Sequence, residues 1–239
     1  MFTGTILNAL GILFGGLLGL ILGRQLSPPT QIALRSLLGF VTVYTGLHLT
    51  WASVNGSLYQ GFKQVVTLVL ALMVGRVIGR LLRLQAGLNR LGESTSRRFA
   101  AATPTDPHRF SEGFWICSVL FCAGPLGPLG AVAEGLGGYW PPLALKAVMD
   151  GLAVMGLTRM FGWGAMLSAV PVAAMQTTLT LVALRLHPFL ETHGLVDATN
   201  AVLGMLIFCV ALILLEIKKV RLGDYLPAIV VAPFITWIW

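Results

Sequence analysis

Residues 3–23 have the sequence TGTILNALGILFGGLLGLILG, in which no Asp, Glu, Lys or Arg occurs. As an α-helix this run is about 31 Å long, which matches the ~30 Å hydrocarbon core of a bilayer. No positively charged stretch precedes it and no small-residue cleavage site follows it. The run therefore predicts a retained membrane span and not a signal peptide.

The rest of the chain has the same apolar character. Hydrophobic residues make up 56% of the 239 residues, charged residues only 10%, and the mean hydropathy is +0.84. Soluble domains carry about 25% charged residues. The composition excludes a soluble, disordered, collagen-like, coiled-coil or disulfide-rich protein and predicts an all-α polytopic membrane protein.

About eight segments are long and apolar enough to be membrane segments, the last of them short. Those after the first are residues 33–53, 64–83, 113–133, 142–161, 164–186, 195–215 and 225–239. With the N-terminus outside, thirteen Lys and Arg residues fall on the cytoplasmic side and only Lys63 and Arg185 outside, with Lys146 just inside its helix. This asymmetry predicts eight crossings with both termini outside. The net charge of +7 therefore indicates membrane orientation, with the bilayer and no nucleic acid as partner.

Residues 84–111 form the only long hydrophilic stretch. Leu84, Leu88 and Leu91 recur at helical spacing, which predicts an amphipathic extension of the third helix along the cytoplasmic headgroups. From Glu93 to Asp106 the composition is typical of a flexible linker, and a solvated tether is preferred to a regulatory segment.

The two ends of the chain resemble each other. An offset near 160 places GTILNA at residues 4–9 over GAMLSA at 164–169, and a similar offset places LLG at 37–39 over VLG at 202–204. Two crossings separate the units, so the second copy is inverted, a plan that recurs in secondary transporters. The expected organisation is a first three-helix repeat at 1–83, the extension and linker at 84–111, a central pair at 112–162 and a second three-helix repeat at 163–239.

Glycines and prolines mark two special segments. Gly11, Gly15, Gly19 and Gly23 form one groove along the first helix, which predicts close packing within the chain, with a homodimer seam as the alternative. Residues 122–130, CAGPLGPLG, place two prolines and three glycines in the middle of the fourth segment. A regular helix is not expected there, and the freed backbone groups near Gly124, Pro125 and Gly127 are candidates for contact with a solute or ion, with a structural kink as the alternative.

Two charges lie within the fifth segment. Lys146 is about 6 Å from the outer helix end and Asp150 about 12 Å, so Asp150 lies near the bilayer centre, where an ionisable group indicates function. A role for Asp150 with an ion, proton or substrate is preferred to simple pairing with Lys146.

Four further polar residues are weaker candidates for the solute or ion site. Asn8 and Ser168 occupy matching positions of the repeat, and helix–helix hydrogen bonding is an equal alternative for them. Gln176 is a candidate pore-lining amide in the middle of the sixth segment. Glu134 is a candidate entrance residue, although an exposed interfacial carboxylate is the preferred interpretation.

No enzymatic or metal-binding signature occurs in the sequence. No hydrolase motif is present, and His48, His187 and His193 lack metal-ligand spacing. Cys117, Cys122 and Cys209 are interpreted as buried small hydrophobic residues. We therefore expect no catalytic residues, no metal and no cofactor.

Several short motifs together are similar to one family. They are residues 122–130, EGL at 134–136, Lys146 with Asp150-Gly151, SAVP at 168–171 with Gln176, Gly4-Thr5 with Asn8, and LPA at 226–228. As a set, nearly from end to end, they resemble the YqgA-like family of prokaryotic inner-membrane proteins (domain of unknown function 554). The resemblance implies a multi-pass protein of the prokaryotic inner (plasma) membrane labelled as a transporter, without a known substrate.

The sequence thus favours a secondary transporter or channel-like permease for a small polar solute or ion, coupled to protons or cations. The alternative is a structural or assembly protein that binds partners through its glycine-lined helices. An intramembrane enzyme is the third and weakest interpretation, since no nucleophile–base set is visible.

Overall fold

The computed structural model describes residues 2–22, 27–101 and 109–239, and 88% of these are helical, with no strand among them. The elements are α1 (Thr3–Leu22), α2 (Pro28–Ala52), α3 (Leu58–Leu81), α4 (Leu84–Ala101), α5 (Arg109–Ala123), α6 (Leu126–Gly137), α7 (Pro141–Phe161), η1 (Gly162–Ser168), α8 (Ala169–Thr192), α9 (Val196–Leu214), η2 (Leu222–Tyr225) and α10 (Ala228–Ile238). The predicted all-α class is therefore confirmed.

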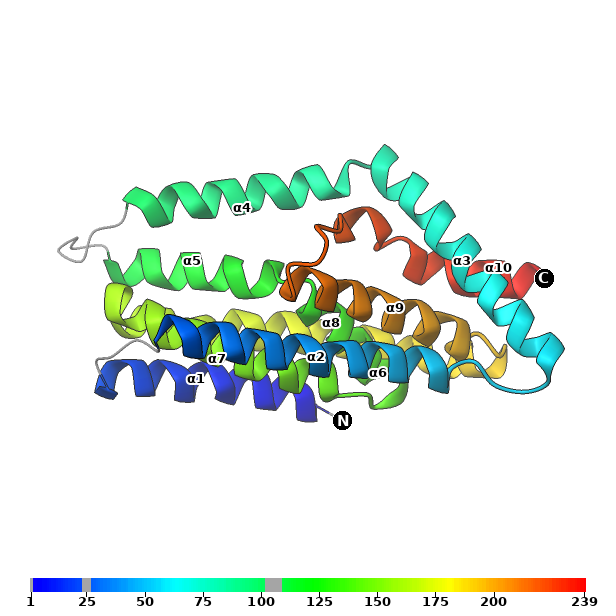
Figure 1. Ribbon diagram of the computed structural model, residues 1–239, viewed down its shortest axis with the longest axis horizontal. Coiled ribbons are helices and arrows are strands. Elements are labelled where there is room, and N and C mark those ends of the chain that lie inside the picture. The colour runs from blue at the N-terminus through cyan, green and yellow to red at the C-terminus, as the bar shows by residue number, and fades with distance from the viewer. Residues whose placement is uncertain (1, 23–26, 102–108) are drawn as a thin grey trace.

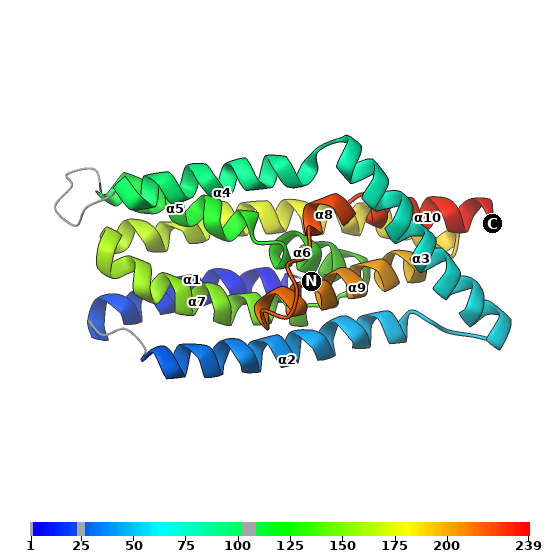
Figure 2. The ribbon, with the colours of Figure 1, turned by 45° about the horizontal axis from the view of Figure 1, so that its top comes forward.

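Five helical stretches are long and apolar enough to cross a membrane, and the bent pair 110–137 makes a sixth. One of the five is the continuous stretch Pro141–Thr192, whose 52 residues would measure about 78 Å as a straight helix. Figures 1 and 2 show that this stretch folds back at η1, so α7 and α8 run in opposite directions. Gly162, with a φ of +67°, begins the turn. The expected eight crossings stay a prediction, since α10 is shorter than a full span.

The outer surface of the bundle is apolar. Phe14, Phe40 and Phe62, on α1, α2 and α3, are 61%, 65% and 69% exposed, and many leucines and valines of these helices are exposed as well. A soluble protein rarely exposes so large a contiguous apolar surface, whereas lipid tails cover it without cost. The structure thus supports the membrane location that the composition predicts.

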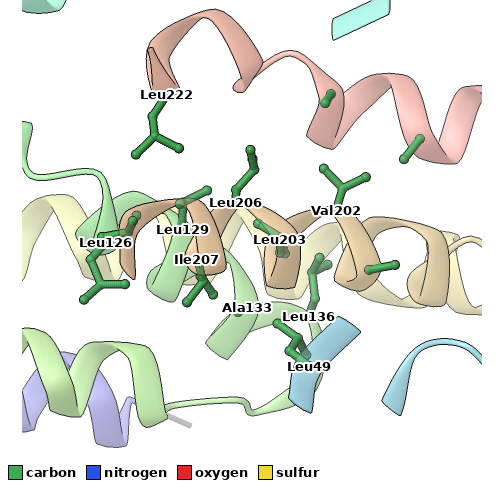
Figure 3. Packing of buried hydrophobic residues seen from close by; sticks show 14 of the residues in the cluster. Leu49, Leu126, Leu129, Ala133, Leu136, Val202, Leu203, Leu206, Ile207 and Leu222 are labelled. Carbon is green, nitrogen blue, oxygen red and sulfur yellow. The ribbon is translucent and has the colours of Figure 1, made fainter. Parts of the chain in front are cut away.

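The interior is built from pairs of closely packed helices. α1 packs on α7, α2 on α9, α3 on α10 and α6 on α8. The larger buried cluster surrounds α9, where Leu203, Leu206 and Ile207 meet Leu129 and Leu136 of α6 (Figure 3). A second cluster joins α1, α5, α7, η1 and α8 around Ile12, Phe121 and Val172. Helix α7 contributes to both clusters, whereas α6 contributes only to the first and α5 only to the second.

The glycine groove of α1 is filled by α7. A Cβ atom on Gly11 would lie 2.5 Å from the carbonyl oxygen of Ala147, and one on Gly151 would lie 2.8 Å from the carbonyl oxygen of Gly11. Gly15 and Gly19 meet the α7 backbone in the same way. Gly23 lies outside the described residues. The groove thus serves packing within the chain.

Helix α4 differs from its prediction. The chain turns at Arg83, whose φ is +52°, and α4 then continues to Ala101, so the flexible linker expected from Glu93 is wrong for residues 93–101. The part expected at 102–106 lies outside the described residues. Figures 1 and 2 show α4 alongside α5, not as a free extension of α3. The Arg98 guanidinium lies 3.3 Å from the Glu112 carboxylate and 4.3 Å from the Trp115 ring centroid, which holds α4 on α5.

Candidate functional site

The two charges of α7 form a buried ion pair. The Lys146 Nζ donates a hydrogen bond of 2.6 Å to Asp150 Oδ2, and the two side chains are only 3% and 9% exposed. Both groups belong to the same helix, one turn apart, so the helix itself brings them together. Removing two charges from solvent is costly, and their close contact offsets part of this cost. The pairing of Lys146 with Asp150, which the sequence offered as the alternative interpretation, is therefore present deep inside the bundle.

The break between α5 and α6 makes room for Lys146. The two helices bend by 57° at Gly124-Pro125, where the sequence predicts that a regular helix cannot continue. A Cβ on Gly127 would lie 2.9 Å from Lys146 Cε, and one on Gly124 would lie 3.6 Å from Lys146 Nζ. The Lys146 ammonium also lies 5.9 Å from the centroid of the Phe121 ring. The structure thus places Gly124 and Gly127, on either side of the bend, next to Lys146.

Two amide side chains lie at the core without partners. Asn8 of α1 and Gln176 of α8 are both 0% exposed, and neither their amide nitrogens nor their amide oxygens have a hydrogen-bond partner. The Asn8 side chain lies near the Asp150 carboxylate. Unpaired buried polar atoms are uncommon in folded proteins and need an explanation.

Asn8 and Gln176 lie at the same level of the bundle. Ile12 of α1 and Val172 of α8 belong to one buried cluster, and the two helices contact each other while running in opposite directions. One turn before Ile12 is Asn8, and one turn after Val172 is Gln176. Four candidate residues from three helices, Asn8, Lys146, Asp150 and Gln176, therefore belong to one central region.

The side chains of Ser168 and Glu134 hydrogen-bond to backbone groups, unlike the unpaired amides of Asn8 and Gln176. The Ser168 hydroxyl donates a hydrogen bond of 2.6 Å to the Ala165 carbonyl within its own turn. Glu134 is 4% exposed and accepts hydrogen bonds from the Gly4 and Thr5 amides at 2.6 and 3.3 Å and from the Thr5 hydroxyl at 3.3 Å. The interpretation of Glu134 as an exposed carboxylate is wrong, because this side chain caps the N-terminus of α1 from inside the bundle.

We expect Glu134→Ala to destabilise the protein by about 1–2 kcal/mol, because the first amides of α1 lose their acceptor. Glu134→Gln retains one acceptor oxygen and should lose less. The free energy of unfolding in mixed micelles measures both changes. Equal losses for the two variants would contradict the capping role.

Some residues of this region had no signal in the sequence. Cys122 lies within electrostatic range of both Lys146 and Asp150, although its apolar surroundings in the sequence indicate only a packed side chain. Phe121 faces Lys146, and Met175 approaches the Gly127 position. Only the position of Cys122, at the start of the broken stretch, could have pointed to it.

A cavity approaches the ion pair from between α4, α5 and α7. Its volume is about 400 Å³, and its lining includes Thr95, Phe99, Ile116, Gly124 and Leu157. Gly124 therefore borders the cavity and also lies near the Lys146 ammonium. A larger cavity, of about 570 Å³, separates α2 from α7 and is lined by Arg35, Leu38 and Met149. The cavity between α4, α5 and α7 is thus the one beside the candidate site.

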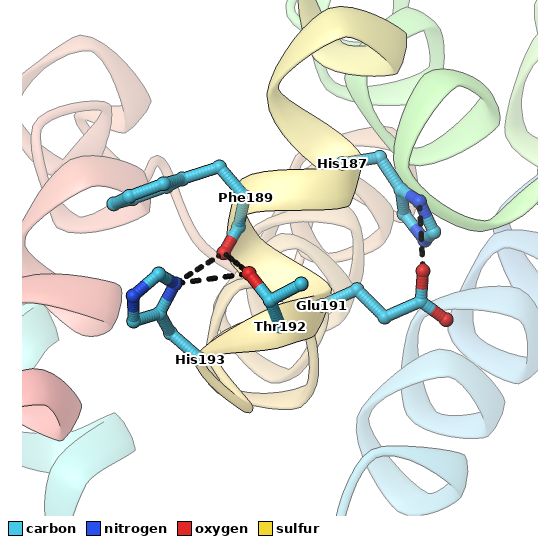
Figure 4. Close-up of polar contacts among 5 residues, drawn as sticks. All are labelled: His187, Phe189, Glu191, Thr192 and His193. Carbon is cyan, nitrogen blue, oxygen red and sulfur yellow. Dashed lines mark hydrogen bonds and ion pairs between the residues drawn. The ribbon is translucent and has the colours of Figure 1, made fainter.

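No metal-binding group is present in the part of the chain that the structure describes, where no three His, Cys, Asp or Glu side chains meet. The histidines of α8 have local partners (Figure 4). His187 Nδ1 lies 3.6 Å from Glu191 Oε2, and His193 Nδ1 lies 2.8 Å from the Phe189 carbonyl oxygen. They belong to the end of α8 and not to the central region.

Comparison with known proteins identifies a family for this chain but no significantly similar solved structure. A family described as protein of unknown function (DUF554) matches residues 3–237. The uncharacterised protein YqgA of Escherichia coli K12 is 27% identical over the whole chain and 98% of its own length. The uncharacterised membrane protein YdfK of Bacillus subtilis 168 is 26% identical over 98% of the chain and 96% of its own length. No solved structure matches the chain significantly.

Proposed function

The chain belongs to the DUF554 family of proteins of unknown function, and on that premise we propose that it is a secondary transporter or permease for a small polar solute. The observation that carries the proposal is the buried Lys146–Asp150 pair beside a broken helix. Ionisable groups inside a membrane bundle are expensive and mark substrate or ion pathways, and broken helices expose backbone groups to the cargo.

The arrangement of the helices supports an inverted repeat. In such a repeat α1 corresponds to α8, α2 to α9, α3 to α10 and α6 to α7. The helix contacts agree with this correspondence. The α1–α7 contact has its counterpart in the α6–α8 contact, and the α2–α9 and α3–α10 contacts are each their own counterpart. The partners in each of the first three exchanges run in opposite directions (Figure 1). Gly46 and Gly204 also meet reciprocally, since a Cβ on either would lie within 3 Å of the other's carbonyl oxygen. Such halves can rock against each other around a central site.

The proposal includes a topology. Eight crossings with both termini outside place nearly all basic residues at the cytoplasmic surface of a prokaryotic inner membrane. The cavity between α4 and α5 is then a cytoplasmic vestibule that ends at Gly124. The ion pair is enclosed in this structure, which corresponds to a closed state of the pathway.

The alternative function, partner binding through glycine-lined helices, has less support. The faces of Gly11, Gly15 and Gly19 are covered by α7 of the same chain, and Gly75 and Gly79 approach α10 and η2. A homodimer would therefore need a different surface.

The first test is solute flux and charge movement in proteoliposomes. Small amino and organic acids are added with and without proton and sodium gradients, and wild type is compared with a folded Asp150→Asn variant. We expect solute-dependent flux in wild type and its loss in the variant, because Asp150 lies in the pathway. Asp197→Asn, the same chemical change near the start of α9, should leave the flux unchanged.

Each result of this test is informative. Flux that persists in Asp150→Asn would retain transport and assign Asp150 to structural pairing with Lys146. No flux of any solute or ion from folded wild-type protein would contradict the transporter and favour the partner-binding alternative.

A further inference from the structure

We infer that the solute is a small zwitterion, whose carboxylate binds Lys146 and whose ammonium binds Asp150 in place of their contact with each other. This inference deepens the proposed function and rests on it for the transport step, although binding itself can be tested separately. It is carried by the buried ion pair together with the unpaired buried amides of Asn8, which lies near Asp150, and of Gln176.

Charge balance distinguishes a zwitterion from a simple ion. A lone cation that binds Asp150 leaves the Lys146 ammonium buried without a partner, and a lone anion that binds Lys146 leaves Asp150 in the same state. An uncompensated charge in a low-dielectric interior is strongly unfavourable. A zwitterion brings one charge of each sign, so both protein charges remain paired when their own contact opens.

The surroundings of the pair differ at its two ends. Lys146 lies against Gly124 and Gly127, where α6 begins at Leu126 without a side-chain cap, so the positive end of the α6 dipole adds to the ammonium. This end favours a carboxylate. Asp150 lies near the Asn8 amide, whose oxygen can accept a hydrogen bond from an ammonium group. The two ends therefore match the two ends of an amino acid.

The amides of Asn8 and Gln176 supply the remaining polar contacts. Both side chains are fully buried and all four of their polar atoms are unpaired. A folded protein avoids such groups unless something binds them. They come from α1 and α8, whereas the charges come from α7, so a bound solute would contact both predicted halves and the central helix.

The solute must be small. The large side chains of Phe121 and Met175 lie close to Lys146 or to the neighbouring Gly127, and neither of the two cavities described above is lined by the pair itself. Short amino acids fit these requirements better than peptides or sugars.

Binding is tested by thermal unfolding of the purified protein with glycine, β-alanine and 4-aminobutyrate, which separate the two charges progressively. Matched probes are propionate alone, propylamine alone and an equimolar mixture of the two. We expect a saturable rise in Tm with at least one zwitterion and none with the mixture. An equal rise with propionate or propylamine, or no rise with any zwitterion, would overturn the inference.

Flux separates this inference from the proposed function. The same probes, radiolabelled, are offered to proteoliposomes. Zwitterion binding without any flux would retain the inference and contradict the transporter. Flux of single ions without zwitterion binding would contradict the inference and retain the transporter.

Two variants test the residues. K146M/D150N removes both charges together and should lose zwitterion affinity by roughly 100-fold or more, because two charge-assisted hydrogen bonds disappear. Gln176→Met should lower affinity roughly 10-fold and also raise Tm without ligand, because an unpaired buried amide is removed. A Gln176→Met variant that gains stability and binds the zwitterion as wild type does would remove Gln176 from the site. Asp197→Asn is the control for both.

Discussion

Replacing Asp150 by Asn should destabilise the protein by about 3–5 kcal/mol, and Lys146→Met should do the same, whereas the double variant K146M/D150N should be at least as stable as wild type. Each single change leaves one buried charge without its partner at 2.6 Å. The double change leaves none, and the new Asn amide can hydrogen-bond to Asn8, which lies nearby.

The free energy of unfolding of all four proteins in mixed micelles completes this double-mutant cycle. Two single losses of about 3–5 kcal/mol without a loss in the double variant correspond to a coupling energy of about 6–10 kcal/mol, which exceeds the usual range for contacting residues because each single change leaves an uncompensated buried charge. Single variants as stable as wild type would show that the pair is solvated in the membrane and would weaken the argument for a central site. The cycle also decides how the transport result is interpreted, since a stable double variant without flux separates function from folding.

Much of the helical framework follows from hydropathy, but its boundaries do not. The segment 3–23 agrees with α1, Thr3–Leu22, whereas the segments predicted at 33–53 and 64–83 begin at Pro28 and Leu58 in the structure. The first turn of each helix follows a serine cap, and Ser57 with Gln60 forms a capping box. An average over apolar residues misses such turns, although the local capping pattern contains the information.

The central ion pair could be predicted because charges inside apolar helices are rare enough to stand out. Lys146 and Asp150 share one helix, so their spacing alone predicts their contact, and the glycines and prolines at 124–128 predict the break. The role of Glu134 could not be predicted in this way. Its partners, the amides of Gly4 and Thr5, are about 130 residues away in the chain, and only the packed structure brings them together.

The shared level of Asn8 and Gln176 in the bundle could not be predicted from the sequence either. The repeat pairs Asn8 with Ser168, but the packing of α1 against α8 places it level with Gln176. A sequence repeat gives equivalent positions in two copies, whereas neighbours across the interface depend on how the copies pack. Helix α4 shows the same dependence, since its contact with α5 involves Arg98 and Trp115 of two separate segments.

The second large effect is expected at the contact between α1 and α7. Gly15→Ala should destabilise the protein by about 2–3 kcal/mol, because the new methyl group meets the backbone of Gly151 and the two helices must separate. Backbone atoms cannot move aside as the end of a flexible side chain can. Gly156→Ala is the matched control in α7, because nothing lies within 4 Å of its Cβ position.

The control variant, Gly156→Ala, should change the free energy of unfolding in the opposite direction. Alanine at position 156 relieves the low helix propensity of glycine without a clash, so Gly156→Ala should stabilise the protein by about 0.5–1 kcal/mol. Unfolding free energies of both variants in mixed micelles give the comparison. If Gly15→Ala were as stable as Gly156→Ala, α1 would not pack on α7 at this distance. The position of Asn8 beside Asp150, which depends on the same contact, would then fail as well.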